Sequence, residues 1–256
     1  NSGQEISLYT PAQLLMHYVN FSDNWYNDNF KMNGGWSLEQ IDPRNYCGEA
    51  SNWSASTDLS GGTPGRKNSI YAPDPDLTAP ILLRAVVNDN RTLTLYFSES
   101  MNSNRMDELS RYTASGNLGH PITATPTAPA YKSVVLMFAD TIVVGQTYTI
   151  SISDTLTDCS GNMIVLNSSA QFAIAYRPSS GDVVINEILS NPREGGADFV
   201  ELYNRSNKII DLKQLLLGTL SNGTPAMKTI TTEGYLLFPG TYVVLSSNTD
   251  AVRQQY

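Results

Sequence analysis

Apolar and polar residues alternate with a period of two along most of this chain, which is the pattern of strands that bury one face. The run Leu93-Thr-Leu-Tyr-Phe97 is one example. Other segments are compact runs of Val, Ile, Leu and Tyr that end at Gly, Asn or Pro, as strands do. Short helices are expected only at residues 11–17 and 104–111. The pattern therefore predicts an all-β fold.

The same pattern divides the chain into segments. Five strands are predicted in its middle, at residues 81–87, 93–97, 133–138, 147–153 and 170–175. Residues 61–80 are rich in Gly and Pro and show no amphipathic pattern, and Arg177-Pro-Ser-Ser-Gly181 forms a second junction. We therefore predict an N-terminal piece at 1–61, a linker at 62–80, a central domain at 81–176 and a C-terminal piece at 181–256.

Composition supports a soluble, β-rich chain. Hydrophobic residues make up 41% of the 256 residues, enough for a core, whereas charged residues make up only 16%. The net charge of −8 argues against a nucleic-acid partner, because binding to phosphates needs clustered Lys and Arg. No apolar run is long enough to span a bilayer.

Several motifs carry a resemblance to known families. Phe97-Ser-Glu-Ser-Met101, Tyr148–Asp154 and Asp158-Cys-Ser-Gly-Asn-Met-Ile164 resemble the bacterial Ig-like domains of surface-layer and adhesin proteins. This resemblance covers essentially all of residues 80–176. It implies a β-sandwich that serves as a spacer or display module.

Both ends of the chain resemble a second family. Asp182–Pro192, Asp198–Asn204 and Tyr235–Ser246 resemble the first half of a lamin-tail domain, an immunoglobulin-like sandwich. Tyr18–Trp25 and Gly34–Pro43 resemble its second half. Because each half alone would leave an apolar sheet face bare, we expect the two pieces to form one lamin-tail-like sandwich. We favour closure within one chain over a domain-swapped dimer.

Candidate catalytic groups are few, and we predict that the chain is not an enzyme. Its two histidines, His17 and His120, lie outside any recognised nucleophile motif. Glu187 and Glu201 occupy matching places in two strands, but both belong to the lamin-tail signatures, where a framework hydrogen-bonding role is expected. We therefore predict no catalytic residues.

We also predict no cofactor and no metal ligands. The alternative is a Ca²⁺ site, because aspartates at positions 74, 76, 89, 154 and 158 lie near the predicted domain ends and could supply oxygen ligands. None of them fits the EF-hand spacing, and Asp in a turn usually caps its own backbone.

Two further side-chain sets bear on function. Two cysteines fit either two buried thiols or one disulfide, and the polar surroundings of Cys47 and Cys159 favour a disulfide that pins one module to another in an exported protein. Trp25 and Tyr26, in a polar loop, are the candidates for contact with a ligand.

These observations predict a non-enzymatic structural, display or adhesion region of a bacterial protein that is secreted, periplasmic or on the cell surface. Its partners would be other domains of the same protein, and a cell-surface protein or glycan. The alternatives are a carbohydrate-binding accessory module and an accessory region of a larger extracellular hydrolase.

Overall fold

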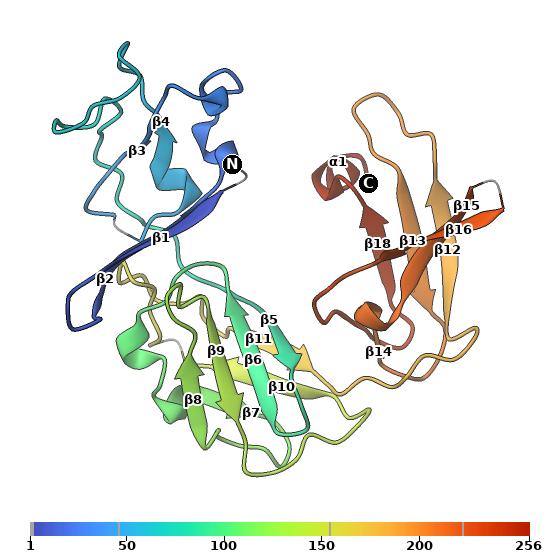
Figure 1. Cartoon of the computed structure of the whole chain (residues 1–256). Coiled ribbons are helices and arrows are strands. Elements are labelled where there is room, and N and C mark those ends of the chain that lie inside the picture. Colours follow the sequence, from blue (N-terminus) through green and yellow to red (C-terminus); the bar gives the residue numbers. More distant parts are fainter. Residues whose placement is uncertain (1–2, 46, 154, 222) are drawn as a thin grey trace.

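Three bodies follow one another along the chain in the computed structural model, which describes residues 3–45, 47–153, 155–221 and 223–256. Figure 1 shows the N-terminal body in blue and the C-terminal body in orange and red, with the central sandwich in green and yellow below and between them. Nearly all regular structure is β-strand, so the predicted all-β fold is confirmed.

The central sandwich consists of two antiparallel sheets. One sheet has four strands in the order β5-β6-β9-β8, and the other has three in the order β11-β10-β7. Their bounds are β5 Leu82–Val87, β6 Thr92–Phe97, β7 Tyr112–Ala114, β8 Thr123–Pro126, β9 Ser133–Met137, β10 Tyr148–Ile152 and β11 Ser169–Phe172. Such a pair of packed antiparallel sheets is the architecture expected of an Ig-like domain.

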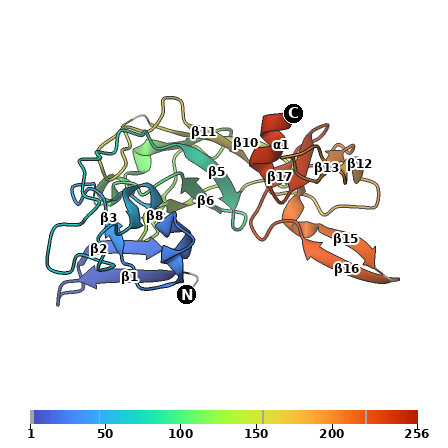
Figure 2. The same ribbon diagram turned by 90° about the horizontal axis from the view of Figure 1, so that it is seen from above.

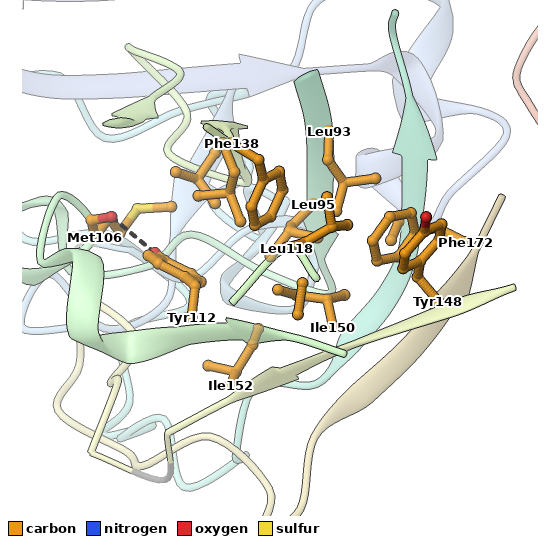
Figure 3. Packing of buried hydrophobic residues seen from close by; sticks show 14 of the residues in the cluster. Leu93, Leu95, Met106, Tyr112, Leu118, Phe138, Tyr148, Ile150, Ile152 and Phe172 are labelled. Carbon is orange, nitrogen blue, oxygen red and sulfur yellow. Dashed lines mark hydrogen bonds between the residues drawn. The ribbon is translucent and has the colours of Figure 1, made fainter. Parts of the chain in front are cut away.

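Alternating side chains of these strands fill the space between the two sheets (Figure 3). Leu93 and Leu95 of β6 are fully buried. Tyr148 stacks on Phe172 with ring centroids 5.4 Å apart, and the Tyr112 hydroxyl donates to the Met106 carbonyl at 2.7 Å. Burying a large apolar side chain contributes roughly 1.5–3 kcal/mol, so this cluster is the main source of stability.

All five strands predicted in this region are present within three residues of their expected bounds. The short strands β7 and β8 were not predicted. The helix expected at residues 104–111 is absent; two 3₁₀ turns, η4 (Ser103–Arg105) and η5 (Leu109–Arg111), lie there instead.

The N-terminal body is built from two hairpin-like pairs, β1 with β2 and β3 with β4. The bounds are β1 Gln4–Tyr9, β2 Leu15–Phe21, η1 Asp23–Tyr26, η2 Lys31–Asn33, β3 Leu38–Gln40, η3 Ala50–Asn52 and β4 Trp53–Ala55. The helix expected at residues 11–17 is wrong. Gln13 adopts a left-handed φ of 62° in the turn between β1 and β2, a conformation that a right-handed helix cannot include.

The predicted linker has no strand or helix, yet much of it is held in place. The amide nitrogen of Ser69 donates to Glu39 Oε2 at 2.7 Å, and that of Asp74 donates to Asp42 Oδ2 at 2.9 Å. Asn68 Nδ2 donates to the Gln40 carbonyl at 2.9 Å. Residues 62–74 therefore line the N-terminal body, and we count residues 3–74 as this body.

The C-terminal body contains a three-stranded sheet in the order β12-β13-β18, with two small strand pairs, β14-β17 and β15-β16. Leu202, Leu212 and Leu237 form its small core. Figure 2 shows β15 and β16 projecting to one side. The bounds are β12 Val183–Leu189, β13 Phe199–Asn204, β14 Ile210–Asp211, η6 Leu212–Gln214, β15 Leu216–Ser221, β16 Thr224–Thr229, β17 Leu236–Leu237, β18 Tyr242–Ser246 and α1 Thr249–Gln255.

The expectation that the two end pieces close on each other within one chain is wrong. Among the described residues, no sheet combines strands of the N-terminal and C-terminal bodies, and Figure 1 shows them on opposite sides. The strands of each end piece instead pair within that piece, β1 with β2, β3 with β4, and β13 with β12 and β18. Ile185 and Ile188 of the C-terminal sheet remain 55% and 62% exposed. Pairing of the end pieces between two chains, as a domain-swapped dimer, stays a prediction.

Candidate functional site at the disulfide-linked joint

The N-terminal body and the central sandwich are linked by a disulfide where they meet, and we call this region the joint. Cys47, from the loop after β3, and Cys159, from the turn after β10, form a disulfide with Cα atoms 6.2 Å apart. The turn that carries Cys159 is itself fixed, because the Cys159 amide donates to the Ser100 carbonyl at 3.1 Å. The two cysteines considered in the sequence therefore lie at the same place in the fold.

Polar contacts reinforce the joint. Lys132 Nζ lies 2.6 Å from Glu49 Oε2 in an ion pair between the central sandwich and the N-terminal body. Asn162 Nδ2 donates to the Asp76 carbonyl at 3.2 Å, and the Val165 amide donates to the Pro80 carbonyl at 3.0 Å. These bonds hold the last part of the predicted linker against the sandwich.

A hollow of about 410 Å³ opens beside the disulfide, between β2 and the central sandwich. We call it the joint hollow. Aromatic rings, amides and the paired charges Glu49 and Lys132 line it, and its lining includes Trp25, Asn102 and Tyr131. A lining that mixes aromatic and neutral polar groups is suited to a small polar ligand.

The structure separates the two candidate ligand-contact residues. Trp25 is half-buried, lines the joint hollow and packs against Trp53 with ring centroids 6.3 Å apart. The Tyr26 hydroxyl donates to the Trp36 carbonyl at 3.1 Å and is also half-buried. Trp25 thus faces the hollow, whereas Tyr26 supports the fold of its own body.

Three carboxylates gather beside the joint. Oxygens of Asp76, Glu99 and Asp158 all lie within 4.8 Å of one another. We call these residues the joint carboxylates. Asp158 is buried and accepts from the Asn162 amide at 2.8 Å and from Asn162 Nδ2 at 2.9 Å. Burial, together with the neighbouring charges of Asp76 and Asp158, raises the pKa of Glu99 to about 7.

The remaining aspartates considered for Ca²⁺ do not join this cluster. Asp89 accepts from the Arg91 and Thr92 amides and so caps its own turn. Asp74 is exposed. Asp154 lies outside the described residues. Glu99 was not singled out in the sequence, because a lone Glu in Phe97-Ser-Glu-Ser-Met101 carries no spacing signal; only the fold brings it to the two aspartates.

The residues weighed for catalysis are dispersed. His17 lies on β2 and lines the joint hollow, whereas His120 Nδ1 is 2.7 Å from the Tyr112 carbonyl oxygen. Glu187 and Glu201 are cross-strand partners in the C-terminal sheet, and Glu201 Oε1 accepts from Asn186 Nδ2 at 2.7 Å. The prediction of no catalytic group stays a prediction.

The polar residue that closes the second lamin-tail motif has a clear structural role. Asn204 is fully buried at the end of β13. Its Nδ2 donates to the Lys208 carbonyl at 2.8 Å and to the Leu237 carbonyl at 2.9 Å. Because buried carbonyls need donors, Asn204 ties the strand end to β17.

Similarity to solved structures is limited. The chain is similar to the N-terminal part of the bacterial S-layer protein SbsC at 14% identity and a TM-score of 0.35, covering 66% of this chain and 44% of that chain. For the S-layer protein rSbsC(31-844) the identity is 16% and the TM-score 0.34, covering 66% and 26%. The chain thus spans less than half the length of either structure. No curated protein matches the chain.

Family models match most of the chain. Residues 73–176 match the bacterial Ig-like domain and residues 177–255 match the lamin tail domain. Among the described residues, no helix is long and apolar enough to cross a membrane. The chain therefore contains a bacterial Ig-like domain at residues 73–176 followed by a lamin tail domain at residues 177–255, as the motifs in those segments predicted, whereas the lamin-tail half expected at the N-terminal end stays a prediction.

Proposed function

We propose that this chain is a non-enzymatic structural region of a secreted or cell-surface bacterial protein, in which the Ig-like sandwich holds its neighbours at fixed positions. The observation that carries this proposal is the joint. A disulfide and an ion pair connect the two bodies, and two hydrogen bonds hold the end of the linker between them against the sandwich. Such a joint suits a spacer that displays or spaces other domains.

The disulfide also supports the exported location. Disulfides persist in oxidising compartments and are rare in the reducing cytosol. Because Cys47 and Cys159 come from different bodies, reduction would remove the covalent link without removing a core residue of either body.

Small-angle X-ray scattering of the oxidised and the reduced chain tests the spacer function. We expect the oxidised chain to give one narrow distribution of interatomic distances. The reduced chain, and a Cys47→Ser/Cys159→Ser variant, should give a broader one. Equal breadth for oxidised and reduced chains would contradict a role of the joint in fixing the bodies.

The alternative function, an accessory region of a larger hydrolase, is tested by measuring hydrolase activity. We expect no turnover of ester, phosphoester or glycoside substrates by the isolated chain. Turnover that is lost when one residue of this chain is replaced would overturn the non-enzymatic proposal.

A second candidate function, glycan binding, is favoured by Trp25 in the joint hollow. Sugar rings stack on aromatic faces and take hydrogen bonds from neutral polar groups such as Asn102. We expect binding on a glycan array to be lost in Trp25→Ala. Phe30→Ala is the matched control, because Phe30 is 76% exposed and does not line the hollow. Equal loss in both variants would argue against this site.

A further inference from the structure

The joint carboxylates come from three segments that are distant in the sequence. Asp76 belongs to the end of the predicted linker, Glu99 to the loop after β6, and Asp158 to the turn that carries the disulfide. Their oxygens nevertheless lie within 4.8 Å of one another. Like charges this close repel strongly, most of all where burial reduces solvation.

No cationic side chain offsets this charge among the described residues. None of the three carboxylates takes part in an ion pair, and the nearby Lys132 is paired with Glu49. Three carboxylates this close repel one another unless a proton or a cation lies between them.

Asn45 supplies an independent observation. Asn45 is only 9% exposed, and its Oδ1 has no hydrogen-bond partner among the described residues. It lines a second hollow, of about 630 Å³, together with Asp76 and Glu99. Its Nδ2 donates to the Asp74 carbonyl at 3.1 Å, which directs the amide group toward the segment that carries Asp76. A buried amide oxygen without a donor is costly unless a ligand satisfies it.

We propose that the joint carboxylates bind a calcium ion. All the available donors are oxygens, which suits a hard cation and not zinc or copper. Calcium accepts six to eight oxygens in flexible geometry, whereas magnesium demands a nearly ideal octahedron and keeps more of its water. Carboxylates from three separate segments, with Asn45 lining the same hollow as Asp76 and Glu99, match calcium better.

The ion would fasten the end of the linker to the sandwich beside the disulfide. Asp76 is the last acidic residue before the central sandwich, and Asp158 is adjacent to Cys159. A cation shared among the linker, the loop after β6 and the 158–162 turn would hold all three together. It would also relieve the repulsion among them.

Isothermal titration of the full, oxidised chain with calcium chloride near neutral pH, after treatment with a chelator, tests the proposal. We expect one site with a dissociation constant on the order of 10⁻⁴ to 10⁻³ M, as in extracellular modules, and weaker binding of magnesium. The midpoint of thermal unfolding should rise with calcium concentration.

Glu99→Gln is the informative variant, because it keeps the size of the side chain and removes one charge. We expect its calcium affinity to fall by at least about tenfold, while its calcium-free midpoint of unfolding stays equal to or above that of the unmodified chain. Glu194→Gln, at an exposed position in the C-terminal body, makes the same charge change and should bind calcium normally.

The proposal is overturned if calcium up to about 10 mM gives neither heat nor a shift of the midpoint. It is also overturned if Glu99→Gln binds calcium as tightly as the unmodified chain does, or if magnesium binds as tightly as calcium.

Discussion

Replacing both cysteines by serine measures how far the joint stabilises the fold. The disulfide joins residues separated by 112 positions. If the N-terminal body and the central sandwich unfold together, closing a loop of that size removes chain entropy worth about 5 kcal/mol in the unfolded state. If the N-terminal body unfolds alone, the loop extends only from Cys47 to the start of β5, about 35 residues, and the same relation yields about 4 kcal/mol.

Both routes of unfolding thus predict a loss of about 4–5 kcal/mol. The assay is urea unfolding followed by tryptophan fluorescence, which reports on the N-terminal body because all three tryptophans, Trp25, Trp36 and Trp53, lie there. The control is the unmodified chain in reducing agent, which should match the double serine variant. A difference of less than about 1 kcal/mol between the oxidised chain and the variant would refute the reasoning.

Three other changes give expected results. Phe172→Ala should lower the free energy of unfolding by about 3–5 kcal/mol because Phe172 is fully buried, whereas Phe30→Ala should change it by less than about 0.5 kcal/mol; equal losses in calorimetry would contradict the assigned core. Glu39→Gln should lower the free energy of unfolding by about 1.5–3 kcal/mol, because the Glu39 carboxylate accepts from Thr63 Oγ1 and from the amide and hydroxyl of Ser69. The same loss in Glu5→Gln, at an exposed strand position, would argue against this role of the hydrogen bonds. Burial alone would raise the pKa of Glu39, but those hydrogen bonds hold it below its ordinary value of 4.5. The N-terminal body should therefore lose stability as pH falls below about 4.5. An acid titration of Glu39→Gln should lack this part of the loss.

The central sandwich was predictable because its strands are long enough to alternate. Leu93, Leu95 and Phe97 belong to the hydrophobic core, and their spacing of two is visible in the sequence. The strand Tyr112–Ala114 has only three residues, too few to show any period. The prediction of a helix at Pro11–His17 was wrong for a related reason. Apolar residues at 14, 15 and 18 fit a helix as well as a hairpin, and only the left-handed conformation of Gln13 decides between them.

The candidate site was less predictable than the fold. The polar settings of Cys47 and Cys159 pointed to the joint, but the contact among Asp76, Glu99 and Asp158 depends on loops from three segments, for which the sequence carries no pattern. The prediction that the end pieces close on each other was wrong because apolar strand faces do not show which strands pair, and here each end piece pairs its own strands. The hydrogen bonds of residues 68–74 with β3 and Asp42 were likewise not visible in composition. The Gly and Pro residues indicated a linker, but they did not indicate which body it would contact.

The disulfide also changes how the molecule would transmit a pulling force. When a chain is stretched from its two ends, tension follows the covalent path, and a cross-link carries the load in place of the loop that it closes. In this protein the path leaves the backbone at Cys47 and rejoins it at Cys159. Strands β5 to β10, which supply most of the central core, lie on the bypassed loop. Of the sandwich strands only β11 stays in the loaded path. The strands on the bypassed loop would therefore carry no tension while the lamin tail domain unravels.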